Sequence, residues 1–237
     1  LHPGLVFYTP ALMTEGVAGA LVACAALVAA GARARGPRLV GAAAIGLVIG
    51  VATLVRPQAL LAAPAFAVLA FAPFGARRAA VAAAVTLGAA LAVCAPWTAR
   101  NCVRMNRCAL VSVNGGWNLL IGTDPAARGT WAPVDVPAEC RNVFDEAEKN
   151  HCFGQSARRR IASAPGAWLA LAPAKLGATF DYAGAGPWYL RAANPAAVSE
   201  RTKVILGACE VVFERATVAA CLAAAIALAR RGRAIFA

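Results

Sequence analysis

A few charged side chains stand at the ends of long apolar runs, where they could do chemistry at a membrane boundary. Arg56 lies in a short interruption between two such runs, and Arg100 follows another. Arginine stays charged and can hold an oxyanion through two parallel N–H donors. The bland alternative for each arginine is a flanking residue that extends to the lipid headgroups. The carboxylates Glu15, Glu210 and Glu214 also stand beside or within apolar runs.

The apolar runs have the length and composition of membrane-spanning helices. The chain is 60% hydrophobic and 14% charged, whereas soluble domains are about 45–50% apolar and about 25% charged. About 17–25 residues are needed to cross roughly 30 Å of hydrocarbon. The alternative interpretation, a soluble alanine-rich bundle, would instead show a polar stripe on each helix. Four runs of 17 residues lack any charge and are predicted to span: Gly16–Ala32, Leu39–Val55, Gln58–Phe74 and Ala79–Ala95.

A fifth span is expected near Val204–Ala229. Its uncharged part, Ala216–Ala229, has 14 residues and would be about 21 Å long. The span must therefore reach back to about Glu210, so that Glu210 and Glu214 share one face of its outer turns. An ionisable residue at that depth usually faces a cavity or the bundle interior. The alternative, that both carboxylates hydrate at the headgroup level, stays open.

Ala164–Phe180 is a further apolar stretch, but we expect it to be interfacial or re-entrant. Two prolines and Lys175 interrupt its 17 residues, and proline breaks a helix interior. The expected class is therefore an all-α membrane protein, a polytopic bundle of about five spans with one extracytoplasmic loop region. The expected segments are spans within 1–97, a loop over 98–163, the interfacial segment 164–180, a connection over 181–203, a span over 204–229 and an end over 230–237.

Short basic loops set the orientation. Arginines cluster in Arg33–Arg38, at Arg77–Arg78 and in Arg230–Arg233. Positive charge in short loops marks the cytoplasmic side. All three clusters fall on that side if five runs span the membrane, which leaves Thr98–Ser163 extracytoplasmic. We expect a multi-pass integral membrane protein, with the bacterial inner membrane as its location.

The net charge of +12 is explained without nucleic acid as a partner. Eight of the 23 basic residues belong to the loop clusters, which face anionic lipid. No basic face interleaved with aromatic residues remains to bind DNA or RNA. Membrane lipid is the partner that the composition predicts.

Four of the eight cysteines lie in the expected outer loop, where an oxidising compartment permits disulfides. Three pairings are possible, and the local choice is Cys102–Cys108 with Cys140–Cys152. A zinc site that uses His151 and Cys152 is the alternative, but no C-x-x-C or H-x-x-H spacing supports it. At least one disulfide is expected. No metal site or cofactor is predicted, and dependence on a divalent cation is left open.

The stretch after the fourth run is dense in polar residues. Trp97 is expected at the headgroup level. Ala109–Val113 and Trp117–Ile121 flank Asn114 and two glycines, and Asn-Gly favours a tight turn because both central residues need positive φ. A small hairpin on the membrane surface is therefore predicted here.

The same stretch resembles a known family. PWTARN (Pro96–Asn101) followed by VSVNGGWNLLIGTDPAARGTW (Val111–Trp131) is similar to an outer-loop signature of the GT-C membrane glycosyltransferases. The nearest similarity is to the branch of protein O-mannosyltransferases and the aminoarabinose transferase of lipid A. Three more stretches fit this order: YTPALMTEG (Tyr8–Gly16), GLVIGVATLVRPQALLAAP (Gly46–Pro64) and DEAEKNHCFGQSARRRIASAPGAWLALAPAKL (Asp145–Leu176).

The resemblance implies transfer of a sugar from a polyprenyl-phosphate carrier to an extracytoplasmic acceptor, which is a glycan, lipid or protein. It makes Arg56 and Arg100 the candidates to bind the carrier phosphate. Tyr8, Glu15, Asn114, Glu210 and Glu214 are expected to line the cavity.

The general base would be a carboxylate of the first outer loop. We expect that loop to precede Leu1, so the chain alone is expected to be inactive. The donor sugar and the acceptor cannot be read from the sequence. The alternatives are a transporter or flippase of a lipid-linked saccharide and a non-enzymatic membrane subunit.

Overall fold

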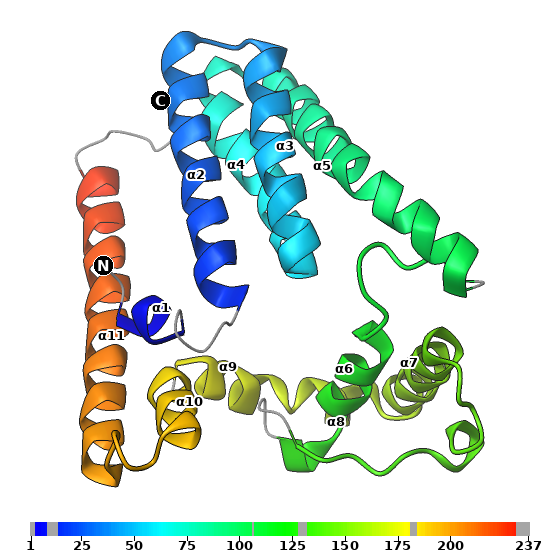
Figure 1. The fold of residues 1–237 in the computed structure, drawn as a ribbon. Coiled ribbons are helices and arrows are strands. Elements are labelled where there is room, and N and C mark those ends of the chain that lie inside the picture. Colours follow the sequence, from blue (N-terminus) through cyan, green and yellow to red (C-terminus); the bar gives the residue numbers. More distant parts are fainter. Residues whose placement is uncertain (1–2, 9–13, 106, 128–131, 181–183, 231–237) are drawn as a thin grey trace. The chain divides into compact units, whose positions relative to one another are not determined.

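The computed structural model describes residues 3–8, 14–105, 107–127, 132–180 and 184–230, and every regular element in these ranges is helical (Figure 1). The predicted all-α class is confirmed. The chain divides into two compact units. The first unit combines residues 1–96 with 184–237, and the second comprises residues 97–183. In sequence, the second unit is therefore an insertion in the first.

The first unit contains most of the long helices. Its elements are α1 (Pro3–Tyr8), α2 (Thr14–Arg35), α3 (Leu39–Val55), the 3₁₀ turn η1 (Pro57–Leu61), α4 (Ala62–Phe71), the 3₁₀ turn η2 (Ala72–Phe74), α10 (Ala185–Ala193) and α11 (Glu200–Arg230). Helix α5 (Ala76–Met105) begins in the first unit and continues into the second.

Three helical segments in the described part of the chain are long and apolar enough to cross a membrane. They are α2, the continuous run η1–α4–η2 and α5. Helix α3 is a shorter apolar helix, and its bounds are those of the predicted run Leu39–Val55. All four predicted runs thus form helices. Helix α11 contains the predicted fifth run, and the count of five spans stays a prediction.

The core of the first unit is built largely from buried alanines, with a few larger side chains such as Ile45 and Phe71. Small residues let helices approach closely. A Cβ at Gly46 of α3 would lie 2.3 Å from the carbonyl oxygen of Thr86 in α5. The hydroxyl of Thr86 donates to the carbonyl of Ala42 over 2.9 Å. This contact joins α3 to α5 inside a largely apolar bundle.

The second unit has its own smaller core. After the end of α5 come α6 (Gly115–Gly122), the 3₁₀ turns η3 (Pro125–Ala127) and η4 (Ala138–Cys140), α7 (Glu146–Ser163), α8 (Pro165–Leu169) and α9 (Ala172–Phe180). Leu120 of α6 and Ala157 of α7 are fully buried. The rings of Trp117 and Phe153 lie 5.1 Å apart between their centroids. Helices α6 and α7 therefore enclose this core.

Two disulfides lie in the second unit. Cys102, near the end of α5, is joined to Cys108, which follows that helix. Cys140 is joined to Cys152, and this disulfide ties η4 to α7. This is the local pairing that the sequence favoured. The other four cysteines, Cys24, Cys94, Cys209 and Cys221, are thiols of the first unit.

The predicted hairpin over Ala109–Val113 and Trp117–Ile121 is wrong, because its second half belongs to helix α6. The reason is a contact distant in sequence. Oδ1 of Asn150 in α7 accepts the N–H of Gly116 over 2.7 Å and that of the next residue over 3.3 Å, which caps α6. A Cβ at Gly116 would lie 1.8 Å from the carbonyl oxygen of Asn150. Gly116 therefore permits close packing of two helices instead of a turn.

The predicted interfacial segment Ala164–Phe180 forms the two short helices α8 and α9. Nζ of Lys175 donates to the carbonyl of Gly122 at the end of α6 and lies 5.8 Å from the ring centroid of Trp168. The predicted connection 181–203 contains helix α10, which the sequence reasoning did not anticipate.

Candidate functional site

Arg56 is positioned by the way α3 ends. A residue before proline is disfavoured in a helix, and Arg56, which precedes Pro57, has an extended backbone (φ −140°, ψ 108°). Its N–H still donates to the carbonyl of Ala52 over 2.8 Å and closes α3. Its side chain reaches the start of α2. There Nε donates to Oγ1 of Thr14 over 2.7 Å, and Nη2 forms a hydrogen-bonded ion pair with Glu15.

The Arg56–Glu15 pair is half-buried, with 34% and 29% of the two side chains exposed. Glu15 stands in the first turn of α2, where the positive end of the helix dipole stabilises a carboxylate. Oε2 of Glu15 is buried and has no hydrogen-bond partner among the described residues. Within the same residues, Nη1 of Arg56 donates to no acceptor. Nη1 of Arg56 is therefore the part of the pair that is left to donate to a bound anion.

Arg100, the second predicted arginine, belongs to the second unit. Its guanidinium carbon lies 4.7 Å from the ring centroid of Trp97, a distance at which a cation is attracted to the ring face. Its Nη1 donates to Oδ1 of Asn101 over 3.1 Å. Arg100 thus makes local contacts on α5, and its role toward a carrier phosphate stays a prediction.

The polar residues near the end of α5 fasten the chain that follows. Asn101 is fully buried, and its Nδ2 donates to the carbonyls of Ala109 (3.0 Å) and Val111 (3.1 Å). Nε1 of Trp97 donates to the same carbonyl of Val111 over 2.9 Å. Buried backbone carbonyls need such donors. These side chains therefore explain much of the unusual PWTARN sequence by structure alone.

The other predicted lining residues are dispersed. Asn114 is exposed before α6 and accepts a hydrogen bond from Ser112 over 2.9 Å. Glu210 is buried in α11 and Glu214 is half-buried. The side chain of Tyr8 lies outside the described part of the structure. The structure brings two of the predicted site residues, Glu15 and Arg56, into direct contact.

A polar pocket of about 340 Å³ in the second unit was not predicted. It lies among the segment after α5, the start of α6 and α7, and its lining includes Arg107, Asn150, His151 and Arg158. Arg107 donates two hydrogen bonds to the carboxylate of Glu148, over 2.5 and 2.9 Å.

The hydrogen bond from Arg107 lowers the pKa of the Glu148 carboxyl, and attraction to Arg107 and His151 adds to this effect. The same hydrogen bond raises the pKa of Arg107. Oδ1 of Asp145 accepts the N–H of Glu148 over 2.9 Å. The spacing Asp145-x-x-Glu148 resembles a capping box and could have located the start of α7 from sequence.

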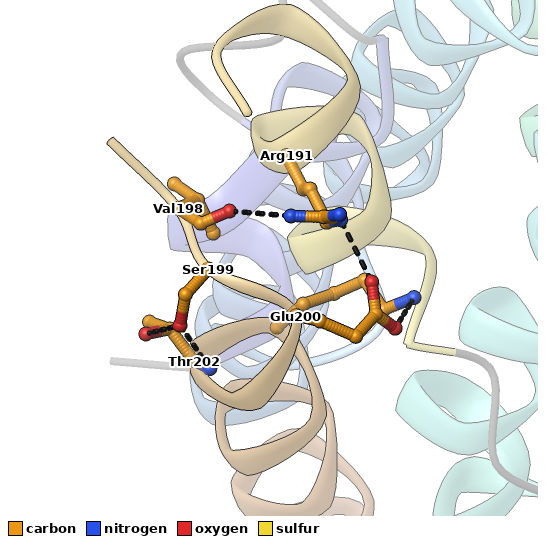
Figure 2. Close-up of polar contacts among 6 residues, drawn as sticks. Arg191, Val198, Ser199, Glu200 and Thr202 are labelled. Atoms are coloured by element: carbon orange, nitrogen blue, oxygen red, sulfur yellow. Dashed lines mark hydrogen bonds and ion pairs between the residues drawn. The ribbon is translucent and has the colours of Figure 1, made fainter. Parts of the chain in front are cut away.

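A second unpredicted cluster joins α10 to α11. Figure 2 shows Arg191 between the carbonyl of Val198 (3.0 Å) and the carboxylate of Glu200 (2.7 Å). Lys203 binds the other oxygen of Glu200, and its hydrogen bond is the main cause of the lowered pKa of Glu200. Ser199 accepts the N–H three residues later over 3.1 Å. The cluster closes the turn between the helices and has the character of a structural junction.

No protein-family model, curated protein or solved structure matches the chain. A function must therefore be argued from the site.

Proposed function

We propose that the chain is part of a membrane glycosyltransferase that moves a sugar from a polyprenyl-phosphate carrier to an acceptor on the extracytoplasmic face. The observation that carries this proposal is the Arg56–Glu15 pair. It places a half-exposed guanidinium at the joint between apolar helices, held by Glu15 and Thr14 of α2. A lipid carrier presents its phosphate at such a boundary.

In the proposed reaction, a hydroxyl oxygen of the acceptor attacks the anomeric carbon of the sugar. The bond between that carbon and the phosphate oxygen breaks, and its electron pair stays on the carrier phosphate. Arg56 stabilises this developing charge through Nη1, and its half-buried position makes the interaction stronger than it would be at a fully exposed site.

The hydroxyl proton passes to a general base. Glu15 is not assigned this role, because it already accepts a hydrogen bond from Arg56. We place the base on a carboxylate of the first outer loop, as the family resemblance implies.

The proposed topology has five spans: α2, α3, the run η1–α4–η2, α5 and α11. Arg56, which lies between α3 and the run η1–α4–η2, then faces the extracytoplasmic side, together with the start of α2. The turn between α2 and α3 and the start of α5 face the cytoplasm, since their arginines lie in short loops. This arrangement puts Arg56 and Glu15 on the side where the carrier presents its sugar.

The test is sugar transfer in membranes that contain the protein. A radiolabelled polyprenyl-phosphate sugar is supplied, and incorporation into acceptor material is measured. We expect Arg56→Gln to lower the transfer rate roughly 100- to 1,000-fold, the usual effect of losing one donor to a developing oxyanion. Arg56→Lys should restore part of the rate, because it keeps the charge but not the planar donor set.

The matched control is Arg104→Gln, which removes an exposed arginine of α5 that forms no ion pair in the described residues. Full transfer by Arg56→Gln, with the protein present at wild-type level, would refute the assigned role of Arg56. Movement of the labelled carrier across the bilayer without transfer would support the flippase alternative instead.

A further inference from the structure

The basic end of the first unit combines positive charge with apolar hollows. Two pockets lie on either side of the turn between α2 and α3. One has a volume of about 290 Å³, between the end of α2 and the start of α3. The other has a volume of about 260 Å³ and lies among the start of α3, the end of α4 and the start of α5.

Each pocket has an apolar floor and an arginine rim. The first is lined by Val28, Val40 and Ala44 together with Arg35 and Arg38. Both arginines are exposed. An acyl chain fits against the aliphatic floor, and a phosphate fits the guanidinium groups.

The second pocket repeats this composition with different elements. Leu39, Phe71 and Val81 form its apolar wall, and Arg77 and Arg78 form its rim. Phe71 is almost fully buried, so its side chain forms the innermost part of the apolar wall. Both arginines stand at the exposed start of α5.

The rim arginines lie in a part of the sequence that lacks carboxylates. The sequence contains no acidic residue between Glu15 and Asp124, and none of the four rim arginines forms an ion pair among the described residues. Gly36 adopts φ 86°, which ends α2 and lets α3 begin at once. Arg35 and Arg38 therefore stand on the two sides of this turn, and both line the first pocket.

We propose that these two pockets bind phospholipids with a net negative headgroup. The phosphate lies against the rim arginines, and the first part of an acyl chain lies on the apolar floor. A zwitterionic phospholipid has the same acyl chains, but its headgroup also carries a positive charge that the arginines repel. This inference rests on the membrane location and not on sugar transfer, so its test measures lipid binding alone.

The experiment uses the purified full chain in detergent, with bound lipid counted by native mass spectrometry. Phosphatidylglycerol is titrated against phosphatidylcholine of the same chains. We expect clear preference for phosphatidylglycerol. Replacing Arg77 and Arg78 by glutamine should weaken its binding by about tenfold or more, given the contribution of each basic residue near anionic lipid. The control pair is Arg158→Gln with Arg160→Gln, exposed arginines of α7.

A second variant set keeps every charge and fills the hollow. Val40→Trp introduces bulk at a pocket-lining position that is 80% exposed, whereas Leu47→Trp adds the same bulk at an exposed site of α3 outside both pockets. We expect Val40→Trp to reduce the number of tightly bound phosphatidylglycerol molecules by one and Leu47→Trp to leave it unchanged. Equal binding of both lipids, or unchanged binding in both the Arg77/Arg78 and the Val40→Trp variants, would overturn the proposal. Displacement of the lipid by soluble glycerol phosphate would show a phosphate site without a lipid preference and would also overturn it.

Discussion

Among single residues, Glu148 is expected to make a contribution to stability that varies with pH. Its folded-state pKa is lowered, mainly by the hydrogen bond from Arg107. A lowered folded-state pKa means that the ionised carboxylate stabilises the fold at every pH above the ordinary glutamate value of about 4.3. This stabilisation is lost as the pH falls through the lowered value.

We therefore expect Glu148→Gln to melt at a lower temperature than the wild type at neutral pH. The difference should begin to shrink as the pH falls below the ordinary glutamate value and should vanish below the lowered pKa of Glu148. Thermal unfolding of the detergent-solubilised protein across a pH series measures this. Glu146→Gln is the matched control, because Glu146 shares the first turn of α7 and forms no ion pair in the described residues. A constant difference across the series would contradict the assignment to Glu148.

The sequence identified Glu15 and Arg56 separately, because a charge beside an apolar run is conspicuous. It could not show that they pair, since they are 41 residues apart and the contact requires α2 and α3 to lie side by side. The structural roles of Asn101 and Asn150 were even harder to predict from the sequence. Each is an ordinary asparagine in a polar stretch, and its importance comes from carbonyl and N–H groups brought to it by the fold.

At the scale of elements, apolar length was the reliable signal. The run Leu39–Val55 became α3 with the same bounds, because basic residues precede it and Pro57 follows closely after it. Helix α5 is longer than the predicted run Ala79–Ala95, since it continues through Pro96 to Met105. The hairpin failed because local turn preference was outweighed by capping and packing from α7.

The contact between α6 and α7 gives a direct test with two neighbouring glycines. Gly116→Ala places a methyl group against the backbone of Asn150 and should cost about 1–3 kcal/mol of stability. Gly115→Ala meets nothing within 4 Å and should leave stability unchanged or slightly higher. Thermal unfolding followed by tryptophan fluorescence reports on both, since Trp117 packs on Phe153 in this core. Equal melting temperatures for the two variants would contradict the close packing.

At the scale of the whole molecule, the proposed orientation can be tested with single cysteines. The background replaces the exposed thiols Cys24, Cys209 and Cys221 by alanine. Ser163→Cys then reports on the second unit, and Pro37→Cys reports on the turn between α2 and α3. In intact cells, a membrane-impermeant thiol reagent should label Ser163→Cys and should reach Pro37→Cys after permeabilisation alone.

Labelling of Pro37→Cys in intact cells, with Ser163→Cys protected, would reverse the proposed orientation. Labelling of both in intact cells would place the turn and the second unit on the same side, which the three proposed crossings between them, α3, the run η1–α4–η2 and α5, do not allow. The disulfides of the second unit favour the expected result, because they form in oxidising compartments.

The insertion of one unit within the other has a consequence for synthesis. Helix α1 packs against α10, and Phe7 lies so close that a Cβ at Gly186 would meet its side chain at 2.8 Å. Roughly 180 residues separate these partners, so a ribosome adding about 5–20 residues per second needs some ten to forty seconds to deliver the second after the first. During that interval the whole second unit emerges. In that interval the nascent α1 has α2 as its packing partner, and the first unit is completed last, after the second unit within it has been synthesised.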